Sequence, residues 1–178
     1  TKPALLKSFA KNISLLNQLG IKVIVVHGGG PQIEKELKKR KINNEEYQGL
    51  RVTTKSVLGV VKRILSHDLN KLISDEIKKN GGKTKRLNGV STKVLKAKIA
   101  MNGNIGFVGE PRGIDKNIIM KALKSNHIPI IAPLGVDANN NTLNVNADTA
   151  AAYIAESLKA ERLLLLTDVA GVLDNNKK

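Results

Sequence analysis

The chain has 178 residues, a formal net charge of +15 at pH 7 and 41% hydrophobic residues, while aromatic residues make up only 2%. This length suits one domain or a large part of a two-lobed one, with a core of aliphatic side chains. The lack of cysteine excludes disulfides and thiolate metal sites, and no apolar run approaches the roughly 20 residues of a membrane span. We therefore expect a cytoplasmic protein that does not enter the membrane, or a protein of the plastid stroma if the gene is organellar.

The positive charge permits two interpretations. It is typical of proteins that bind nucleic acid or another polyanion, and also of a basic surface that attracts anionic substrates. The basic residues are mostly lysine, and their longest cluster, residues 38–41, falls at a predicted helix end, where cations are favourable. With so few aromatic rings the chain offers little for stacking against bases. Nucleic-acid binding is therefore the less favoured interpretation.

The first predicted helix covers residues 4–19 and ends at Gly20. Its apolar stripe consists of Leu5, Phe9, Ile13 and Leu16.

A strand over residues 21–26 then stops at three consecutive glycines, Gly28, Gly29 and Gly30. Pro31 starts a second helix, which runs to about residue 41. Glycines let backbone N–H groups approach a ligand closely, and a helix start adds free N–H groups and a partial positive charge. The stretch predicts a site for a phosphate or a carboxylate, although a tight turn could need glycine for its geometry alone.

Residues 43–54 are polar and irregular, as in a hairpin or a flap, and contain Arg51. A guanidinium can clamp a carboxylate, whereas an ordinary solvated arginine is the alternative. A long helical region follows over residues 57–77, with a potential break near residues 66–68. His67 has no partner motif, and we interpret it as a surface histidine. The apolar positions of this helix are Val57, Val60, Val61, Ile64, Leu65, Leu69, Leu72, Ile73 and Ile77.

The next part of the chain predicts short strands over residues 84–109, a helix over residues 114–126 with Asp115 near its start, and a buried strand over residues 128–133. Because proline has no N–H to donate, we expect Pro129 among the first residues of that strand or at an irregular edge of the sheet.

A second polar group gathers at a predicted helix start. Asn144 and Asn146 lie on the same side of a short strand, and Ala147 opens a helix with Asp148 in its first turn. Helix capping is a strong alternative explanation for Asn146 and Asp148. Two asparagines and an aspartate at one helix mouth are nevertheless more than capping requires.

The leucines at residues 163–166 predict a further strand, which ends at Thr167-Asp168. Strands separated by helices imply βαβ crossovers and a mainly parallel sheet, in which ligands bind beyond the carboxyl ends of the strands. The glycine turn, the helix mouth at residues 144–148 and the loop at Thr167-Asp168 all follow strands.

Taken together, these stretches resemble the amino-acid kinase family, and within it the acetylglutamate kinases. Seven pieces match in order and spacing along nearly the whole chain. They are Val26-His27-Gly28-Gly29-Gly30-Pro31, Gly49-Leu50-Arg51-Val52-Thr53, Asn70-Lys71, Gly106-Phe107-Val108-Gly109-Glu110, Ile128-Pro129-Ile130-Ile131-Ala132-Pro133, Asn144-Val145-Asn146-Ala147-Asp148-Thr149-Ala150-Ala151 and Leu166-Thr167-Asp168-Val169-Ala170-Gly171-Val172-Leu173.

The resemblance implies an α/β fold, a three-layer αβα sandwich with a central, mainly parallel sheet, incomplete at both termini. Residues 1–160 would form the amino-acid-substrate lobe, and residues 161–178 would begin the nucleotide-binding lobe. The implied reaction is transfer of the γ-phosphoryl group of ATP, with Mg²⁺, to the side-chain carboxylate of N-acetyl-L-glutamate in arginine biosynthesis. A homo-oligomer, either a dimer or a hexamer, is implied as well.

The same resemblance assigns roles to individual residues. Gly29 and Gly30 would bind the amino-acid substrate and the moving phosphoryl group, Arg51 and Asn144 would hold its α-carboxylate and acetamido end, and Asp148 would orient catalytic lysines. No residue is assigned to a metal. The nucleotide site would begin with Asp168, Val169, Gly171, Val172 and Leu173.

The chain departs from the family pattern at three places. The family opens with a Lys-x-Gly-Gly strand and carries a second catalytic lysine beyond the position of Leu173, and neither lies in this chain, so a fragment without turnover is one expectation. In the middle, Asn88-Gly89-Val90-Ser91-Thr92 stands in place of a Ser-Gly-Lys-Asp-Gly segment. Two alternatives stay open: a related kinase for an aminoadipate derivative or aspartate, and a non-catalytic basic binding module of the same fold.

Overall fold

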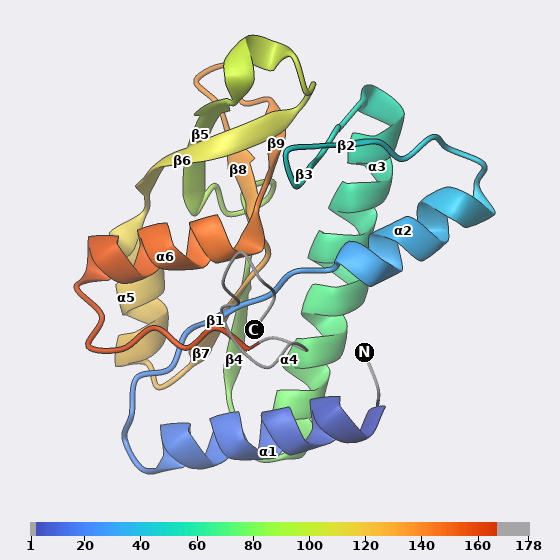
Figure 1. Ribbon diagram of the computed structural model, residues 1–178. Helices are drawn as coiled ribbons and strands as arrows, with labels where there is room; N and C mark the ends of the chain where they lie inside the picture. The colour runs from blue at the N-terminus through green and yellow to red at the C-terminus, as the bar shows by residue number, and fades with distance from the viewer. Residues whose placement is uncertain (1–2, 167–178) are drawn as a thin grey trace, which may run out of the picture.

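The computed structural model describes residues 3–166 as an α/β protein with helices on both faces of a parallel sheet (Figure 1). None of the described helices is long and apolar enough to cross a membrane. The helices are α1 (Pro3–Gln18), α2 (Gly30–Lys39), α3 (Lys55–Arg63), the π-helix η1 (Ile64–Leu69), α4 (Asn70–Lys79), the 3₁₀ helix η2 (Met101–Gly103), α5 (Lys116–Lys124) and α6 (Ala147–Leu158). The strands are β1 (Val25–Val26), β2 (Glu46–Tyr47), β3 (Leu50–Arg51), β4 (Thr84–Leu87), β5 (Leu95–Ile99), β6 (Val108–Ile114), β7 (Ile128–Ile131), β8 (Leu134–Val136) and β9 (Thr142–Val145).

The parallel sheet has the strand order β1–β7–β4 and forms the middle of three layers. On one face, Val25 and Ile130 pack with Ala10 of α1 and Ile77 of α4. On the other face, Ile131 packs in a cluster to which α5 and α6 contribute. Successive side chains of a strand point to opposite faces, so one fully apolar strand supplies both cores. This confirms the predicted αβα layers around a parallel sheet.

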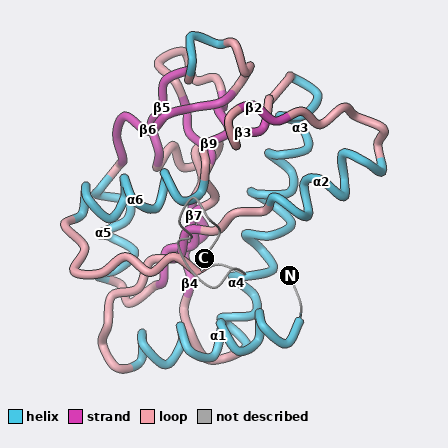
Figure 2. The backbone as a smooth tube through the Cα atoms, in the orientation of Figure 1, coloured by secondary structure: helices cyan, strands magenta, loops and turns pink. Residues whose placement is uncertain are grey.

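A barrel and a two-stranded sheet lie above the parallel sheet in the view of Figure 1. β5, β6, β9 and β8 close into a small barrel with both parallel and antiparallel pairs. β2 and β3 form the predicted hairpin (Figure 2). An isolated bridge between Thr53 and Gly106 ties the end of the hairpin to the loop before β6. The hairpin is therefore anchored to the barrel and not a free flap.

One predicted strand is shorter in the structure, and another is absent from the described residues. The strand expected over residues 21–26 contains only Val25 and Val26, because these are its residues with partners on β7. The strand expected over residues 163–166 is wrong: the segment has no regular structure, and Leu164 is 75% exposed. A strand forms only where another backbone supplies hydrogen bonds, and no described strand pairs with this segment. The predicted lobe boundary at residue 160 stays a prediction.

Pro129 is the second residue of β7, the middle strand of the described sheet, so its predicted edge position is wrong and a position among the first strand residues is confirmed. The N–H groups of Ile128 and Ala132 donate toward β4, to Lys83 O (2.7 Å) and Leu87 O (3.0 Å). By alternation, the side of Pro129 that lacks an N–H faces β1. The β1 ladder begins only at Ile130, so no hydrogen bond of that ladder is lost.

The long helical region shows the irregularity expected near residues 66–68 as a π-helical turn, η1, which joins α3 to α4 without a break. A π-helical turn closes over five residues instead of four and so rotates the positions after it. Leu72, predicted to be apolar and inward, is 46% exposed, whereas Asn70 and Ser74 are buried.

Helix α1 is also rotated from the prediction, since Leu5 is 64% exposed. The other three residues of the predicted stripe are partly buried at its edge. The residues that α1 buries are Leu6, Ala10, Ser14 and Asn17.

Candidate functional site

The glycine turn leads from β1 into α2, as predicted. Gly29 is the N-cap residue, Pro31 occupies the first turn, and neither a capping side chain nor an acidic residue stands at this helix start. The partial positive charge of the helix end is therefore not neutralised by α2 itself, which favours an anion there.

Gly29 and Gly30 of this turn differ in what surrounds them. A Cβ on Gly29 would lie 2.6 Å from Leu69 Cδ1 and 2.8 Å from Leu65 Cδ2, so packing against η1 explains this glycine. A Cβ on Gly30 would meet no heavy atom within 4 Å. The fold leaves open space beside Gly30, where a ligand can approach the start of α2.

The start of α6 lies next to this turn. A Cβ on Gly28 would be 3.5 Å from Ala147 Cβ, an ordinary contact distance. Asn146 caps α6 by accepting a hydrogen bond from Thr149 N (2.9 Å), so capping is confirmed for Asn146. Asp148 is exposed and has neither a hydrogen bond nor an ion pair with any described residue. Its carboxylate is therefore available for a ligand or another charged group.

Arg51 and Asn144 are brought together through Thr53, which is fully buried. Asn144 Nδ2 donates to Thr53 Oγ1 (3.1 Å), and this hydroxyl donates in turn to Arg51 O (2.9 Å). Phe107 joins the same backbone, since its N–H donates to Thr53 O (2.8 Å) and its C=O accepts from Asn144 N (2.8 Å). The Gly-Leu-Arg-Val-Thr stretch and β9 are thus one unit, although sequence reasoning gave Thr53 no role of its own.

The side chain of Arg51 is half-buried and donates to Asn44 Oδ1, a neutral acceptor. Glu46 lies opposite Arg51 in the hairpin register, yet no ion pair joins Arg51 to any carboxylate within residues 3–166. A cation with only neutral partners is suited to an incoming carboxylate.

Sequence reasoning missed a buried polar network directly behind the glycine turn. Arg86 Nε donates to Asn70 Oδ1 (2.9 Å), and Asn70 Nδ2 contacts both Ile130 O (2.9 Å) and His27 Nε2 (3.1 Å). Because Arg86 can only donate, Asn70 Oδ1 is the acceptor, and the amide N–H must donate to His27 Nε2. His27 Nδ1 then carries the proton and donates to Gly28 O (3.1 Å). The available signals were His27 and Asn70, since each stands in one of the matched pieces.

This network fixes His27 as a neutral ring. Burial lowers the pKa of His27 below its ordinary value. The hydrogen bond to Gly28 raises this pKa, but by less than burial lowers it. A protonated ring would also turn Nε2 into a donor facing another donor on Asn70. His27 therefore holds the turn in place, and its ring is not suited to take up a second proton at neutral pH.

The structure thus gathers Gly29, Gly30 and Asp148 around the starts of α2 and α6, and ties Arg51 to Asn144. Within residues 3–166 there is no group of three His, Cys, Asp or Glu residues that could hold a metal ion. The predicted nucleotide-site residues lie outside the described residues: Asp168, Val169, Gly171, Val172 and Leu173.

The sequence profile of the amino acid kinase family matches residues 1–178. The chain belongs to this family. Acetylglutamate kinase from Acinetobacter baumannii is 43% identical over 188 aligned residues, which cover 99% of the chain and 62% of that relative. The same enzyme from Psychrobacter arcticus is 42% identical over 184 aligned residues, covering 97% and 61%. The chain therefore spans about three-fifths of the length of these curated relatives.

A solved structure has a similar overall fold. The crystal structure of smu.665 from Streptococcus mutans UA159 has a TM-score of 0.88 and 31% sequence identity, and the match covers 93% of this chain and 68% of that one. The family and the α/β kinase fold predicted from the matched pieces are both confirmed.

Proposed function

We propose that this protein phosphorylates the side-chain carboxylate of N-acetyl-L-glutamate with ATP, giving N-acetyl-L-glutamyl 5-phosphate and ADP, a step of arginine biosynthesis. The observation that carries the proposal is the open, uncapped start of α2 at Gly30 beside the start of α6. The 43% identity to an acetylglutamate kinase along almost the whole chain supports this substrate over aspartate or an aminoadipate derivative.

Phosphoryl transfer depends on in-line positioning and on neutralising the charge of the transferring group. We assign Gly29 and Gly30 to the substrate and the moving phosphoryl group, because the space beside Gly30 is open and the partial charge of this helix start is positive. The buried network through His27 keeps the turn fixed, which lowers the cost of ordering it when a ligand binds.

The α-carboxylate and acetamido end of the substrate would lie between Arg51 and Asn144. Arg51 supplies a cation without an ionic partner among the described residues. Asn144 uses its Nδ2 on Thr53, so its Oδ1 stays free to accept the acetamido N–H. Thr53 joins the side chain of Asn144 to the backbone of Arg51, so the strand segments that carry the two groups are tied together.

Asp148 would not act as a general base, since the acceptor carboxylate is already ionised at neutral pH. Its exposed carboxylate at the start of α6 would hold lysine ammonium groups near the transferring phosphoryl. ATP supplies the phosphoryl group, and a Mg²⁺ ion bound to its phosphates would offset their charge. We assign no residue to Mg²⁺. Assembly as a dimer or hexamer and a cytoplasmic location stay predictions.

The proposal is tested with Arg51→Ala and the matched control Arg112→Ala. Arg112 is an exposed arginine of β6, away from the end of that strand that pairs with Asn144. Loss of a charge-assisted contact at a desolvated site costs about 2–5 kcal/mol. Calorimetry should therefore show that Arg51→Ala weakens N-acetyl-L-glutamate binding by about thirtyfold or more, and that Arg112→Ala leaves it unchanged.

Hydroxylamine trapping of an acyl phosphate, run with ATP and each of N-acetyl-L-glutamate, L-aspartate and N-acetyl-aminoadipate, identifies the acceptor. If folded Arg51→Ala bound N-acetyl-L-glutamate as tightly as the unmodified chain does, the assignment of Arg51 to the substrate site would be refuted. Faster trapping with L-aspartate or N-acetyl-aminoadipate would show that this acceptor, and not N-acetyl-L-glutamate, is the substrate. Filter binding at rising salt tests the basic-module alternative, because a polyanion binder loses affinity steeply.

A further inference from the structure

A cavity of about 380 Å³ lies at the Arg86 end of the buried network, whereas the glycine turn lies at the His27 end. It is bounded by the end of α3, the π-helix η1, β4 and the turn at residues 88–92, the segment that departs from the family pattern. Its lining residues are Lys62, Arg63, Ser66, His67, Arg86, Asn88, Val90 and Ser91.

Of the three basic side chains that line this cavity, Arg63 forms ion pairs, whereas Lys62 and Arg86 form none with the described residues. Arg63 is compensated, since its guanidinium lies 2.7 Å from Glu36 and 3.8 Å from Asp68. Lys62 and Arg86 have no ion pair within residues 3–166, and no described residue that lines the cavity carries a carboxylate. The hydrogen bond from Lys71 and, more weakly, the charge of Arg86 help to lower the pKa of Asp75, a carboxylate that lies outside the cavity lining. The hydrogen-bond partners of the half-buried guanidinium of Arg86 are neutral, so an anion on the cavity side would stabilise it further.

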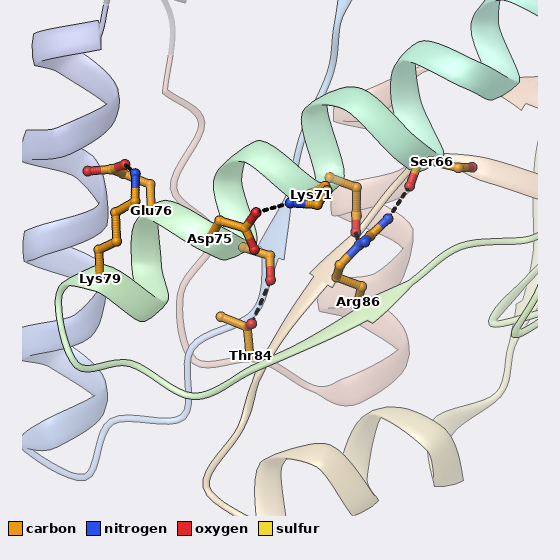
Figure 3. Close-up of polar contacts among 9 residues, drawn as sticks. Ser66, Lys71, Asp75, Glu76, Lys79, Thr84 and Arg86 are labelled. Atoms are coloured by element: carbon orange, nitrogen blue, oxygen red, sulfur yellow. Dashed lines mark hydrogen bonds and ion pairs between the residues drawn. The ribbon is translucent and has the colours of Figure 1, made fainter.

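Arg86 is held rigidly with part of its guanidinium unused. Its Nε donates to Asn70 Oδ1 (2.9 Å), and its Nη2 donates to Ser66 O (2.7 Å), reaching from β4 to the helix (Figure 3). Nη1 has no partner among the described residues. Because two contacts already fix the plane of the group, little entropy is lost when a third partner binds.

The facing turn offers donors of the same kind. Asn88 is only 8% exposed, and its Oδ1 accepts from Val90 N and Ser91 N (both 2.8 Å), so the orientation of the amide is fixed. Its Nδ2 has no partner among the described residues. Ser66, 6% exposed, carries a buried hydroxyl that likewise has none. The unused polar atoms of Arg86, Asn88 and Ser66 are therefore donors, or a hydroxyl able to donate.

We propose that this cavity binds a small anion carrying a phosphate or carboxylate group, with Lys62, Arg86 and Asn88 as its ligands. The anion supplies a counter-charge on the cavity side of Arg86, where no lining residue carries a carboxylate, and the acceptor oxygens that Asn88 Nδ2 lacks. The site is separate from the glycine turn, and it does not depend on which acceptor the kinase phosphorylates.

The test titrates the 178-residue chain with inorganic phosphate and, separately, with citrate at constant ionic strength, following backbone amide shifts by NMR. Saturable shifts at Val90 and Ser91 are expected for at least one probe, and the two titrations tell phosphate from carboxylate chemistry. Lys62→Gln should weaken binding about 2–5-fold, as for a partly exposed charge. Asn88→Asp keeps the acceptor that orders the turn but adds a negative charge, and should weaken binding about tenfold or more.

The matched control is Lys121→Gln, which removes the same charge from the last turn of α5, a nine-residue helix like α3. It should leave the affinity unchanged. Equal losses in all three variants would show a general charge effect of the basic surface and overturn the proposal. So would shifts confined to the amides of the glycine turn, or no saturation with either probe.

Discussion

Replacing Gly29 and Gly30 in turn by alanine separates packing from ligand binding at the same turn. In Gly29→Ala the new Cβ would lie 2.6 Å and 2.8 Å from methyl groups of Leu69 and Leu65, which are themselves 7% and 2% exposed. Overpacking of this kind costs about 1–3 kcal/mol, and the entropy gain from replacing glycine returns about 0.4–1 kcal/mol. We expect a net loss of about 1–2 kcal/mol of unfolding free energy.

Gly30→Ala should behave in the opposite way. No heavy atom lies within 4 Å of its new Cβ, and alanine suits a helical position better than glycine, so the unfolding free energy should stay level or rise by up to about 1 kcal/mol. The added methyl group, however, occupies the open space at the start of α2. Binding of N-acetyl-L-glutamate should weaken by about tenfold, or about 1.4 kcal/mol.

Chemical denaturation and calorimetry on the two variants measure both quantities. For a chain of this length, the loss in Gly29→Ala corresponds to a fall of about 2–8 °C in Tm. If Gly30→Ala bound the substrate as the unmodified chain does, the glycine turn would be a geometric device and the assignment of Gly30 would be refuted. A Gly29→Ala variant of full stability would refute the packing argument.

The remaining predictions concern the start of α6 and the buried histidine. Asn146→Ala should lose about 1 kcal/mol of stability, the usual value of an N-cap, with substrate affinity intact, whereas Asp148→Asn should keep its stability in thermal melts. Assayed in the full-length enzyme, Asp148→Asn should lower kcat far more than it raises KM, and a near-normal kcat would remove its catalytic role. Because burial lowers the pKa of His27 from 6.5, the unfolded chain binds more protons there. The unfolding free energy should therefore fall as the pH drops through about 6.5 toward the folded pKa. The same titration on His27→Gln should be flatter between pH 6.5 and 5.5, and an equal slope would assign the loss to other groups.

Local signals in the sequence predicted much of the fold. Asp115 accepts hydrogen bonds from Asn117 N and Ile118 N at the start of α5, and the all-apolar run of β7 is a buried parallel strand, as predicted. The glycine turn leads from a strand into a helix, and the Gly49–Thr53 stretch belongs to a hairpin. These features are decided within a few residues, by capping, spacing and backbone freedom, so a single sequence contains them.

The same signals failed where an element depends on a distant partner. Residues 163–166 have the composition of a strand, yet a strand needs a neighbouring backbone, and the described residues supply none. Leu5 and Leu72 fit helical stripes, but the packing of α1 and the π-helical turn point them outward. Periodicity shows that a helix has an apolar face, and only packing decides how it is rotated.

The details of the candidate site also came from the tertiary structure. The sequence identified three glycines and an asparagine–aspartate helix mouth, but it could not tell that Gly29 is required by leucines from η1 or that Asn146, and not Asp148, is the cap. The contact of His27 with Asn70 joins residues 43 positions apart. Such contacts depend on which faces of distant elements meet, and that is determined by the packing of the whole core, not by the residues beside them in the chain.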